Sequence, residues 1–338
     1  MQAKPSITGR DTGLQETMGV PLASRKGSPR ADFLNDAGSA TSDLRARVTD
    51  RFVAMLAQGA PVFRERWSLA ARHGVPCNGL TGAPYRGINV LLFWEAAIEQ
   101  GHTFNVWLTY KQAARLGGQV RKGEKGVMGV LLQPSSAHAR ARSARDKGPI
   151  SGAEGAGVVC QPFWVFNVAQ IAGLPDRVSA MALIRQTSSL TPIAAAEALL
   201  VGSGATLRHS SGQACYAPAH DEIALPSPHR FRSAEAYYAC ALHALVHWTG
   251  HPSRLGRFLG RSLGDENDAF EALVAELGRA FVMAHLGLDA TVTRYPVDLS
   301  SWLAMLRKDC NAIFVAAGQA VRACDYLLAM SCGTQAKA

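Results

Sequence analysis

The sequence lacks the features that mark several large classes of protein. It has no run of about 18 or more apolar residues, and its first residues lack the apolar core of a secretory signal peptide. Neither a G-x-x-x-x-G-K-[ST] phosphate loop nor a G-x-G-x-x-G dinucleotide loop is present. We therefore expect a cytoplasmic protein that does not span a membrane and is neither a nucleotide-driven motor nor a dehydrogenase.

The sequence also lacks paired cysteines and has a low fraction of charged residues. The seven cysteines are scattered and form no C-x-x-C pair, which argues against a disulfide framework and against a cysteine-bound zinc ion. Charged residues make up 18% of the chain and hydrophobic residues 48%, the balance of a globular protein. A length of 338 residues is enough for about two domains.

The net charge of +9 is concentrated in the first part of the chain. Residues 1–150 hold 21 Lys and Arg against 11 Asp and Glu, whereas the remaining residues hold 14 against 15. A basic segment joined to a neutral one favours a polyanion-binding module attached to a second unit of different function.

The first part is predicted to contain a leader and a small α/β domain. Residues 1–40 are rich in glycine, serine, proline and charge without periodicity, which predicts a disordered leader. Residues 41–185 are predicted to form the domain, with a flexible low-complexity insertion at 134–157. Apolar spacing and capping signals predict helices at 42–59, 87–101 and 109–117, and paired strands at 126–134 and 158–170.

The second part, residues 190–330, is predicted to be a mainly helical domain. The apolar pattern indicates helices at 191–204, 233–250, 268–287 and 300–328, and short strands within 205–218 and 221–226. The two parts together predict an α+β fold with two domains.

Basic and aromatic residues alternate along the segment from Tyr85 to Lys125. Single-stranded nucleic acid is bound by cations that follow the phosphates and by exposed rings on which bases stack. The predicted DNA-binding residues are Tyr85, Arg86, Trp107, Tyr110, Lys111, Arg121, Lys122 and Lys125. Two alternatives remain open: the rings belong to the core, or TYKQAARLGG begins a helix-turn-helix, although the glycine-rich segment after it is a poor recognition helix.

A pair of histidines in the second part has the spacing of zinc ligands. His243 and His247 lie four residues apart on a predicted helix, so both rings leave the same face. In an H-E-x-x-H peptidase the residue after the first histidine is the glutamate that deprotonates the zinc-bound water. Here that residue is Ala244, which has no proton acceptor. The alternative is that both histidines are ordinary helix residues.

A third zinc ligand is expected from the next helix, which contains Glu271 and Glu276. Five residues place the two side chains about 140° apart around a helix, so we do not expect both to face one metal. Glu276 lies among apolar residues, where a carboxylate needs a partner. Glu276 is therefore the predicted third ligand, with Glu271 as the alternative.

Six segments occur in the order found in a known family, between about residues 45 and 330. They are YRGINVLLFW, WLTYKQAARLGGQVRKGEKG, FWVFNVAQIAGLP, YAPAHDEIALP, HALVHWTGHPSRLGR and EALVAELGRAF. In these segments the chain resembles the ArdC-type antirestriction proteins, which are related to the N-terminal part of TraC-type conjugative primases. The resemblance implies an N-terminal domain that binds single-stranded DNA and a C-terminal zincin-like metallopeptidase domain.

The chain departs from the family pattern at two positions. Family members usually read H-E-L-V-H and E-E-L-V-A-E, whereas this chain has Ala244 and Ala272 in place of glutamates. The resemblance carries over His243, His247 and Glu276 as zinc ligands. If the third ligand instead corresponds to Ala272, with Glu276 as its outer partner, the site has lost a ligand as well as its base.

The resemblance implies a protein that protects incoming single-stranded DNA of plasmids or other mobile elements, with a host restriction or conjugation protein as a further partner. Because loss of a general base costs about 10²–10⁴-fold in rate, the peptidase-like domain is expected to be weak or inactive. Two alternatives are an active zinc metallopeptidase that uses another base, such as Glu271, and a primase-associated accessory module.

Overall fold

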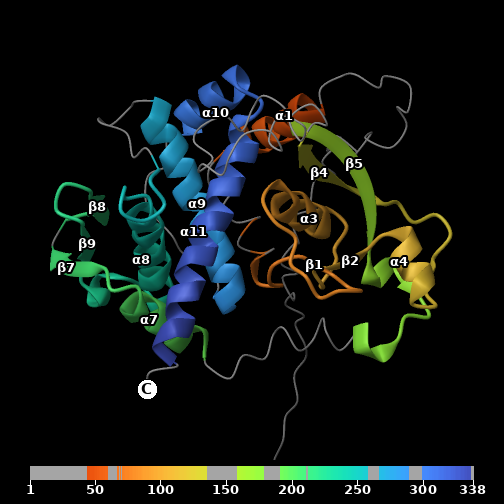
Figure 1. The fold of residues 1–338 in the computed structure, drawn as a ribbon, viewed down its shortest axis with the longest axis horizontal. Helices are drawn as coiled ribbons and strands as arrows, with labels where there is room; N and C mark the ends of the chain where they lie inside the picture. The colour runs from red at the N-terminus through yellow and green to blue at the C-terminus, as the bar shows by residue number, and fades with distance from the viewer. Residues whose placement is uncertain are drawn as a thin grey trace, which may run out of the picture. The chain divides into compact units, whose positions relative to one another are not determined.

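The computed structural model describes residues 44–59, 67, 69, 71–134, 158–178, 191–210, 212–257, 266–288 and 299–335. The predicted leader at 1–40 and nearly all of the predicted insertion at 134–157 lie outside these ranges. The described residues all belong to one compact unit, Ser42–Ala338 (Figure 1).

The described part of the N-terminal region combines helices with two small sheets. Its elements are α1 (Leu44–Leu56), β1 (Cys77–Asn78), α3 (Ile88–Glu99), β2 (Val106–Leu108), α4 (Tyr110–Arg115), β3 (Gln119–Val120), β4 (Val127–Pro134), β5 (Val158–Asn167), a 3-10 turn (Val168–Gln170) and β6 (Ile171–Ala172). The three predicted helices are confirmed. In α1 the apolar stripe predicted from the sequence is buried at Val48, Phe52 and Met55.

Helix α4 begins and ends at the residues that the capping signals predicted. The Thr109 hydroxyl accepts a hydrogen bond from the Gln112 backbone N–H at 3.2 Å, and the Gln112 side chain accepts one from the Thr109 backbone N–H at 2.9 Å. This reciprocal pair is a capping box. Gly117 follows the helix with a φ of 82°, the left-handed conformation that glycine adopts most easily.

Strands β4 and β5 form the predicted antiparallel pair, in register from Val127 opposite Val165 to Pro134 opposite Val158. The four-stranded sheet has the order β1-β2-β5-β4, so β4 is an edge strand. Figure 1 shows this pair as a long curved ribbon beside α3. The Asn89 side chain of α3 pairs with both backbone groups of Val130, at 2.8 and 2.7 Å, and so covers part of the exposed edge.

The C-terminal region is mainly helical. Its elements are α7 (Pro192–Gly202), β7 (Thr206–Ser210), β8 (Cys215–Ala217), β9 (Glu222–Pro226), a 3-10 turn (Pro228–Arg230), α8 (Ala234–Thr249), α9 (Glu266–Leu286), α10 (Leu299–Lys308) and α11 (Ala312–Gln335). The segment 205–218 forms two strands, and the sheet order is β7-β9-β8. The two regions confirm the predicted α+β class.

The prediction of one helix over 300–328 was wrong. The chain leaves the helical conformation between α10 and α11, where the Asp309 carboxylate accepts hydrogen bonds from the backbone and side-chain N–H groups of Asn311. Aspartate and asparagine compete in this way with helical hydrogen bonding, so they favour turns and helix starts. The apolar spacing continues through the break, which is why it suggested one helix.

Helices α8, α9 and α11 pack against one another (Figure 1). A Cβ at Gly278 would lie 2.8 Å from a Val246 methyl group, so the absent side chain lets α9 approach α8 closely. Within the described ranges, α11 is the one helix long and apolar enough to cross a bilayer. Its fully buried Ala316, Ala317 and Ala320 pack in the core, and a core helix of this kind meets the same criteria.

The two regions share a hydrophobic core. Trp94 of α3 contacts Phe281 of α9, with ring centroids 5.7 Å apart. The Thr49 hydroxyl of α1 donates a hydrogen bond of 2.7 Å to the backbone carbonyl of Cys310, between α10 and α11. The N-terminal and C-terminal regions are therefore joined by packing as well as by the chain.

Candidate metal centre and nucleic-acid interface

The two histidines predicted as metal ligands lie together on α8. This helix begins at Ser233, whose hydroxyl accepts a hydrogen bond from the Ala236 backbone N–H, and Gly250 caps its C-terminus. The ring centroids of His243 and His247 are 5.0 Å apart, with the ring planes at 80°. The four-residue spacing therefore brings both rings to one face, as predicted.

Each histidine faces a buried glutamate of α9. The Nδ1 atom of His247 lies 3.3 Å from a carboxylate oxygen of Glu271, and Nδ1 of His243 lies 3.6 Å from one of Glu276. The later histidine pairs with the earlier glutamate, so α8 and α9 run antiparallel. The two glutamates face different histidines, because their partners lie four residues apart on an antiparallel helix, and the expectation that they do not both face one metal stays a prediction.

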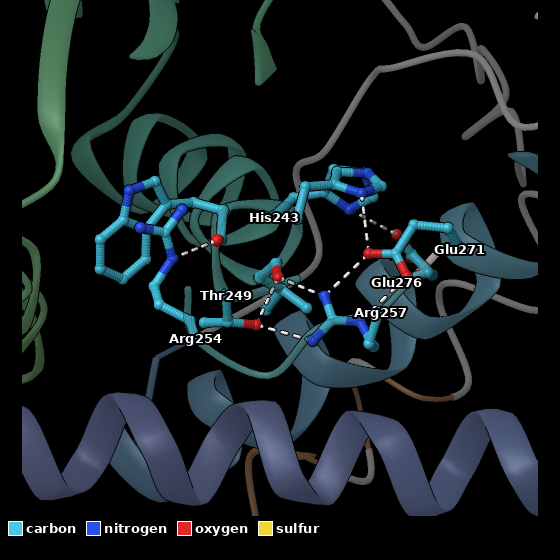
Figure 2. Close-up of polar contacts among 9 residues, drawn as sticks. His243, Thr249, Arg254, Arg257, Glu271 and Glu276 are labelled. Atoms are coloured by element: carbon cyan, nitrogen blue, oxygen red, sulfur yellow. Dashed lines mark hydrogen bonds and ion pairs between the residues drawn. The ribbon is translucent and has the colours of Figure 1, made fainter. Parts of the chain in front are cut away.

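A buried arginine neutralises Glu271. Arg257, in the turn after α8, donates from Nε to one carboxylate oxygen at 3.0 Å and from a terminal nitrogen to the other at 2.8 Å. It also donates to the Thr249 hydroxyl at 2.8 Å and to the Val246 carbonyl at 2.6 Å. Figure 2 shows Arg257 between Thr249 and the glutamates. Arg257 therefore fixes the turn to both helices.

The electrostatic surroundings keep Glu271 ionised. Burial alone would raise the pKa of this carboxyl, but its hydrogen bonds and electrostatic interactions with His247 and Arg257 outweigh burial and hold the pKa below its usual value. The carboxylate is thus already engaged by the Arg257 guanidinium and the His247 ring.

A second buried arginine neutralises Glu276. Arg279, one turn further along α9, donates from a terminal nitrogen to the Glu276 carboxylate at 2.6 Å. The side chains of Arg279 and Glu276 are only 2% and 1% exposed. The cluster of two histidines and two glutamates therefore contains one buried guanidinium for each carboxylate.

The residues present do not complete a catalytic zinc site. Such a site uses three protein ligands and leaves a fourth position for water. Within the described ranges, no group of three or more His, Cys, Asp or Glu side chains is arranged to hold a metal ion. Both glutamates lie on the Nδ1 side of the histidines, where zinc sites place the outer carboxylates that orient the rings. This geometry favours the alternative in which Glu276 is an outer partner and the lost ligand corresponds to Ala272.

The end of α8 is held by a second arginine network. Arg254 lies over the ring of Trp248, 3.8 Å from its centroid, and donates to the Trp248 carbonyl at 2.6 Å. It also donates to the Asp221 carboxylate at 2.9 Å. The hydrogen bond from Arg254 lowers the pKa of Asp221, so this ion pair ties the turn before β9 to the helix that carries the histidines.

Two of the predicted DNA-binding residues have rings that pack on Phe93, and a third is exposed but forms an ion pair with another helix. Trp107 is 0% exposed and stacks on Phe93 at 5.3 Å, so the prediction that its ring stacks a base does not fit its burial in the core. Tyr85 packs edge-on against Phe93 at 4.7 Å. Arg86 is exposed but forms an ion pair with Asp325 of α11.

The other five predicted residues are exposed and come from one short segment. Tyr110 and Lys111 lie at the start of α4, and Arg121, Lys122 and Lys125 lie in the turn between β3 and β4. We call these five residues the cationic face.

Hydrogen bonds hold the turn of the cationic face in place. The Arg121 backbone N–H donates to the Gln170 carbonyl at 3.0 Å, and the Arg121 side chain donates to Glu124 at 2.8 Å. Hydrogen bonds from Gln170 and Arg121 lower the pKa of Glu124. The acidic residue of the turn is therefore paired within it, whereas Lys122 and Lys125 are exposed to solvent.

Three residues of these sites were not predicted from the sequence. Nothing in the sequence predicted that Arg257 and Arg279 are buried. An arginine normally marks an exposed position when helices are predicted from the spacing of apolar residues. Trp164 is 45% exposed on β5. Period-two alternation could have found it, since the flanking Phe163 and Val165 point toward the core.

The fold and the two sites define a class of protein with an α/β N-terminal region and a C-terminal domain that carries the histidine helix of a zinc peptidase. The N-terminal domain of the anti-restriction factor ArdC matches residues 42–166, and a zincin-like metallopeptidase domain matches residues 194–319.

Similar proteins agree with these matches. The crystal structure of the antirestriction protein ArdC from plasmid R388 in its metal-free form is 35% identical, with a TM-score of 0.67, and the match covers 86% of this chain and 98% of that one. The Mn(II)-bound form is 36% identical, with a TM-score of 0.64 and the same coverage. The uncharacterized protein y4eC of Sinorhizobium fredii is 32% identical over 87% of this chain and 94% of that protein. The chain belongs to the ArdC family of antirestriction proteins.

Two DNA primases TraC of Escherichia coli are 36% and 35% identical over 294 residues. The chain spans only 27% and 20% of their lengths.

Proposed function

We propose that the chain binds single-stranded DNA through its cationic face and protects mobile or conjugative DNA from host restriction, with a zincin-like domain that lacks peptidase activity. The observation that carries the DNA-binding part is the clustering of five exposed basic and aromatic residues in one turn and one helix start. Ammonium and guanidinium groups follow phosphates, and exposed rings stack unpaired bases. The family to which the chain belongs supports the antirestriction part.

The proposed inactivity rests on the surroundings of the two histidines. Ala244 stands at the position of the general base, and both nearby glutamates are paired with buried arginines. An active peptidase that uses Glu271 as its base is the second candidate. It is less favoured, because the hydrogen bonds that hold the pKa of Glu271 low also make this carboxylate a weaker proton acceptor.

We add proposals on zinc, the domain limits, the location and the partners. We propose that zinc binds weakly, through His243 and His247 alone, because a stable site needs further ligands. The boundaries 41–185 and 190–330 stay as proposed domain limits, and the family matches lie within them. We also propose a cytoplasmic location and a host restriction or conjugation protein as partner. A primase-associated role is the third candidate, supported by the similarity to part of TraC.

The DNA-binding proposal is tested by fluorescence anisotropy with a labelled single-stranded oligonucleotide and its duplex. Binding to the single strand is expected at about 50 mM salt and should weaken by orders of magnitude toward about 200 mM. Lys122→Ala with Lys125→Ala should reduce affinity, whereas Arg232→Ala, which removes an exposed cation of the C-terminal region, should not. An absence of binding at low salt would refute the proposal.

The antirestriction part needs its own experiment. A plasmid transferred by conjugation into a restricting host should yield more transconjugants when the chain is expressed than when the Lys122 and Lys125 variant is expressed. Equal yields with both proteins, in a host where ArdC of R388 raises the yield, would contradict a role for the cationic face.

A further inference from the structure

Trp164 differs from every other tryptophan of the chain in its exposure. The other five are at most 5% exposed: Trp67, Trp94, Trp107, Trp248 and Trp302. Trp164 is 45% exposed, although it lies in the middle of β5, the longest strand of its sheet. A large aromatic ring exposed on the face of a sheet strand is a candidate contact surface for another molecule.

The strand geometry places Trp164 beside the cationic face. Side chains two residues apart on a strand share a face, so Trp164 lies on the same side of β5 as Phe166. The Phe166 ring contacts the ring of Tyr110, with centroids 6.4 Å apart, and Tyr110 is 54% exposed. The exposed rings of Trp164 and Tyr110 therefore both lie near Phe166, which is partly buried.

The turn that carries the two lysines leads into the backbone beside the same ring. A Cβ at Gly126 would lie 3.2 Å from the Phe166 ring, so the backbone that follows Lys125 passes directly over it. Lys122 and Lys125 are exposed, and the acidic Glu124 between them is engaged by Arg121 and Gln170. The surface therefore combines ring faces with positive charge, which matches a single-stranded polyanion better than an apolar partner.

We propose that Trp164 and Tyr110 form the base-stacking part of the interface, with the phosphates of single-stranded DNA on Lys122 and Lys125. This inference rests on the proposed DNA-binding function and assigns the ring contacts within it. Trp164 takes the place that the buried Trp107 cannot fill.

The chain offers a spectroscopic test, because Trp164 is its one strongly exposed tryptophan. Binding of unlabelled oligo(dT) to the full chain should quench tryptophan emission, since a stacked base contacts this indole directly. Trp164→Phe should abolish the quenching and keep most of the affinity, because phenylalanine still offers a ring face. Trp164→Ala should lower the affinity by about 5- to 150-fold, the range expected for one stacked base.

Leu131→Ala is the matched control. Leu131 is also 45% exposed and lies on the same strand pair, but its register partner is Gln161, which points to the opposite face from Trp164. This variant should bind within about twofold of the parent. Urea unfolding of each variant should confirm that the fold is kept.

Two outcomes separate the inference from the function on which it rests. If Trp164→Ala binds as tightly as the parent and the parent shows no quenching, while the lysine variants bind weakly, the stacking assignment is wrong and DNA binding stands. If the parent binds no oligonucleotide at low salt, the proposed function itself fails.

Discussion

Replacing Arg279 by methionine tests how the histidine cluster is stabilised. Arg279 donates to the Glu276 carboxylate at 2.6 Å and lies 3.3 Å from the sulfur of Met283. The variant keeps an apolar chain of similar length but leaves a carboxylate buried without its guanidinium. Removing one partner of a buried ion pair costs about 3–5 kcal/mol, because the remaining charge is not compensated. We expect a loss of about 3 kcal/mol, the lower end, because His243 stands 3.6 Å from Glu276 and can take up part of the charge.

The matched double variant isolates the contribution of charge. Arg279→Met combined with Glu276→Leu removes both charges, and replacing a buried pair by apolar residues is often neutral or stabilising. The double variant should therefore be more stable than Arg279→Met alone by at least about 2 kcal/mol. Arg208→Met is the surface control, since Arg208 is 69% exposed and its ion pair with Glu222 is worth about 0–1 kcal/mol.

Urea denaturation of the full chain, followed by circular dichroism, measures these differences as shifts of the transition midpoint at constant slope. Two results would refute the reasoning. One is a double variant as unstable as Arg279→Met, which would mean that the arginine acts by packing. The other is a single variant within about 1 kcal/mol of the parent, which would mean that Glu276 is not held as a buried anion.

Three further predictions follow from the same contacts. The double variant Ala244→Glu, Ala272→Glu should bind about one equivalent of zinc, measured by elemental analysis. Ala244→Glu alone should not, because it restores the general base but adds no third zinc ligand. Arg254 lowers the pKa of Asp221, so this carboxylate contributes stability above its unfolded pKa of about 3.9 and loses it as the pH falls through the lower folded value. The difference in urea midpoint between the parent and Asp221→Asn should therefore be largest near neutral pH and vanish in acid; a constant difference would contradict the assignment. Asn89→Ala should cost about 1–3 kcal/mol and speed amide exchange at the edge of β4, and unchanged exchange would count against its capping role.

Much of the local structure could be predicted because single residues determine it. Thr109 and Gln112 specify the start of α4, and Ser233 specifies the start of α8, since each cap satisfies a backbone N–H within one turn. The histidine spacing on α8 fixed the shared face of both rings in the same way. Such features depend on a few neighbouring residues and need no knowledge of the rest of the fold.

The features that sequence reasoning missed depend on residues that are distant in the sequence. The pairing of Glu271 and Glu276 with two histidines depends on the antiparallel packing of α8 and α9, which periodicity does not show. Trp107 is buried because it stacks on Phe93 of α3, although its basic neighbours suggested exposure. The described residues thus divide the predicted DNA-binding set into a core part and a surface part that composition alone could not separate.

The most direct test of the central claim is the salt dependence of single-stranded DNA binding, measured for the parent and for the Lys122→Ala, Lys125→Ala double variant. Each phosphate contact contributes about −0.7 to the slope of log K against log salt for a single strand. The account predicts a steep negative slope for the parent and a slope smaller in magnitude by about 1.4 for the variant. Identical slopes for the two proteins would contradict the claim that this face carries the phosphates.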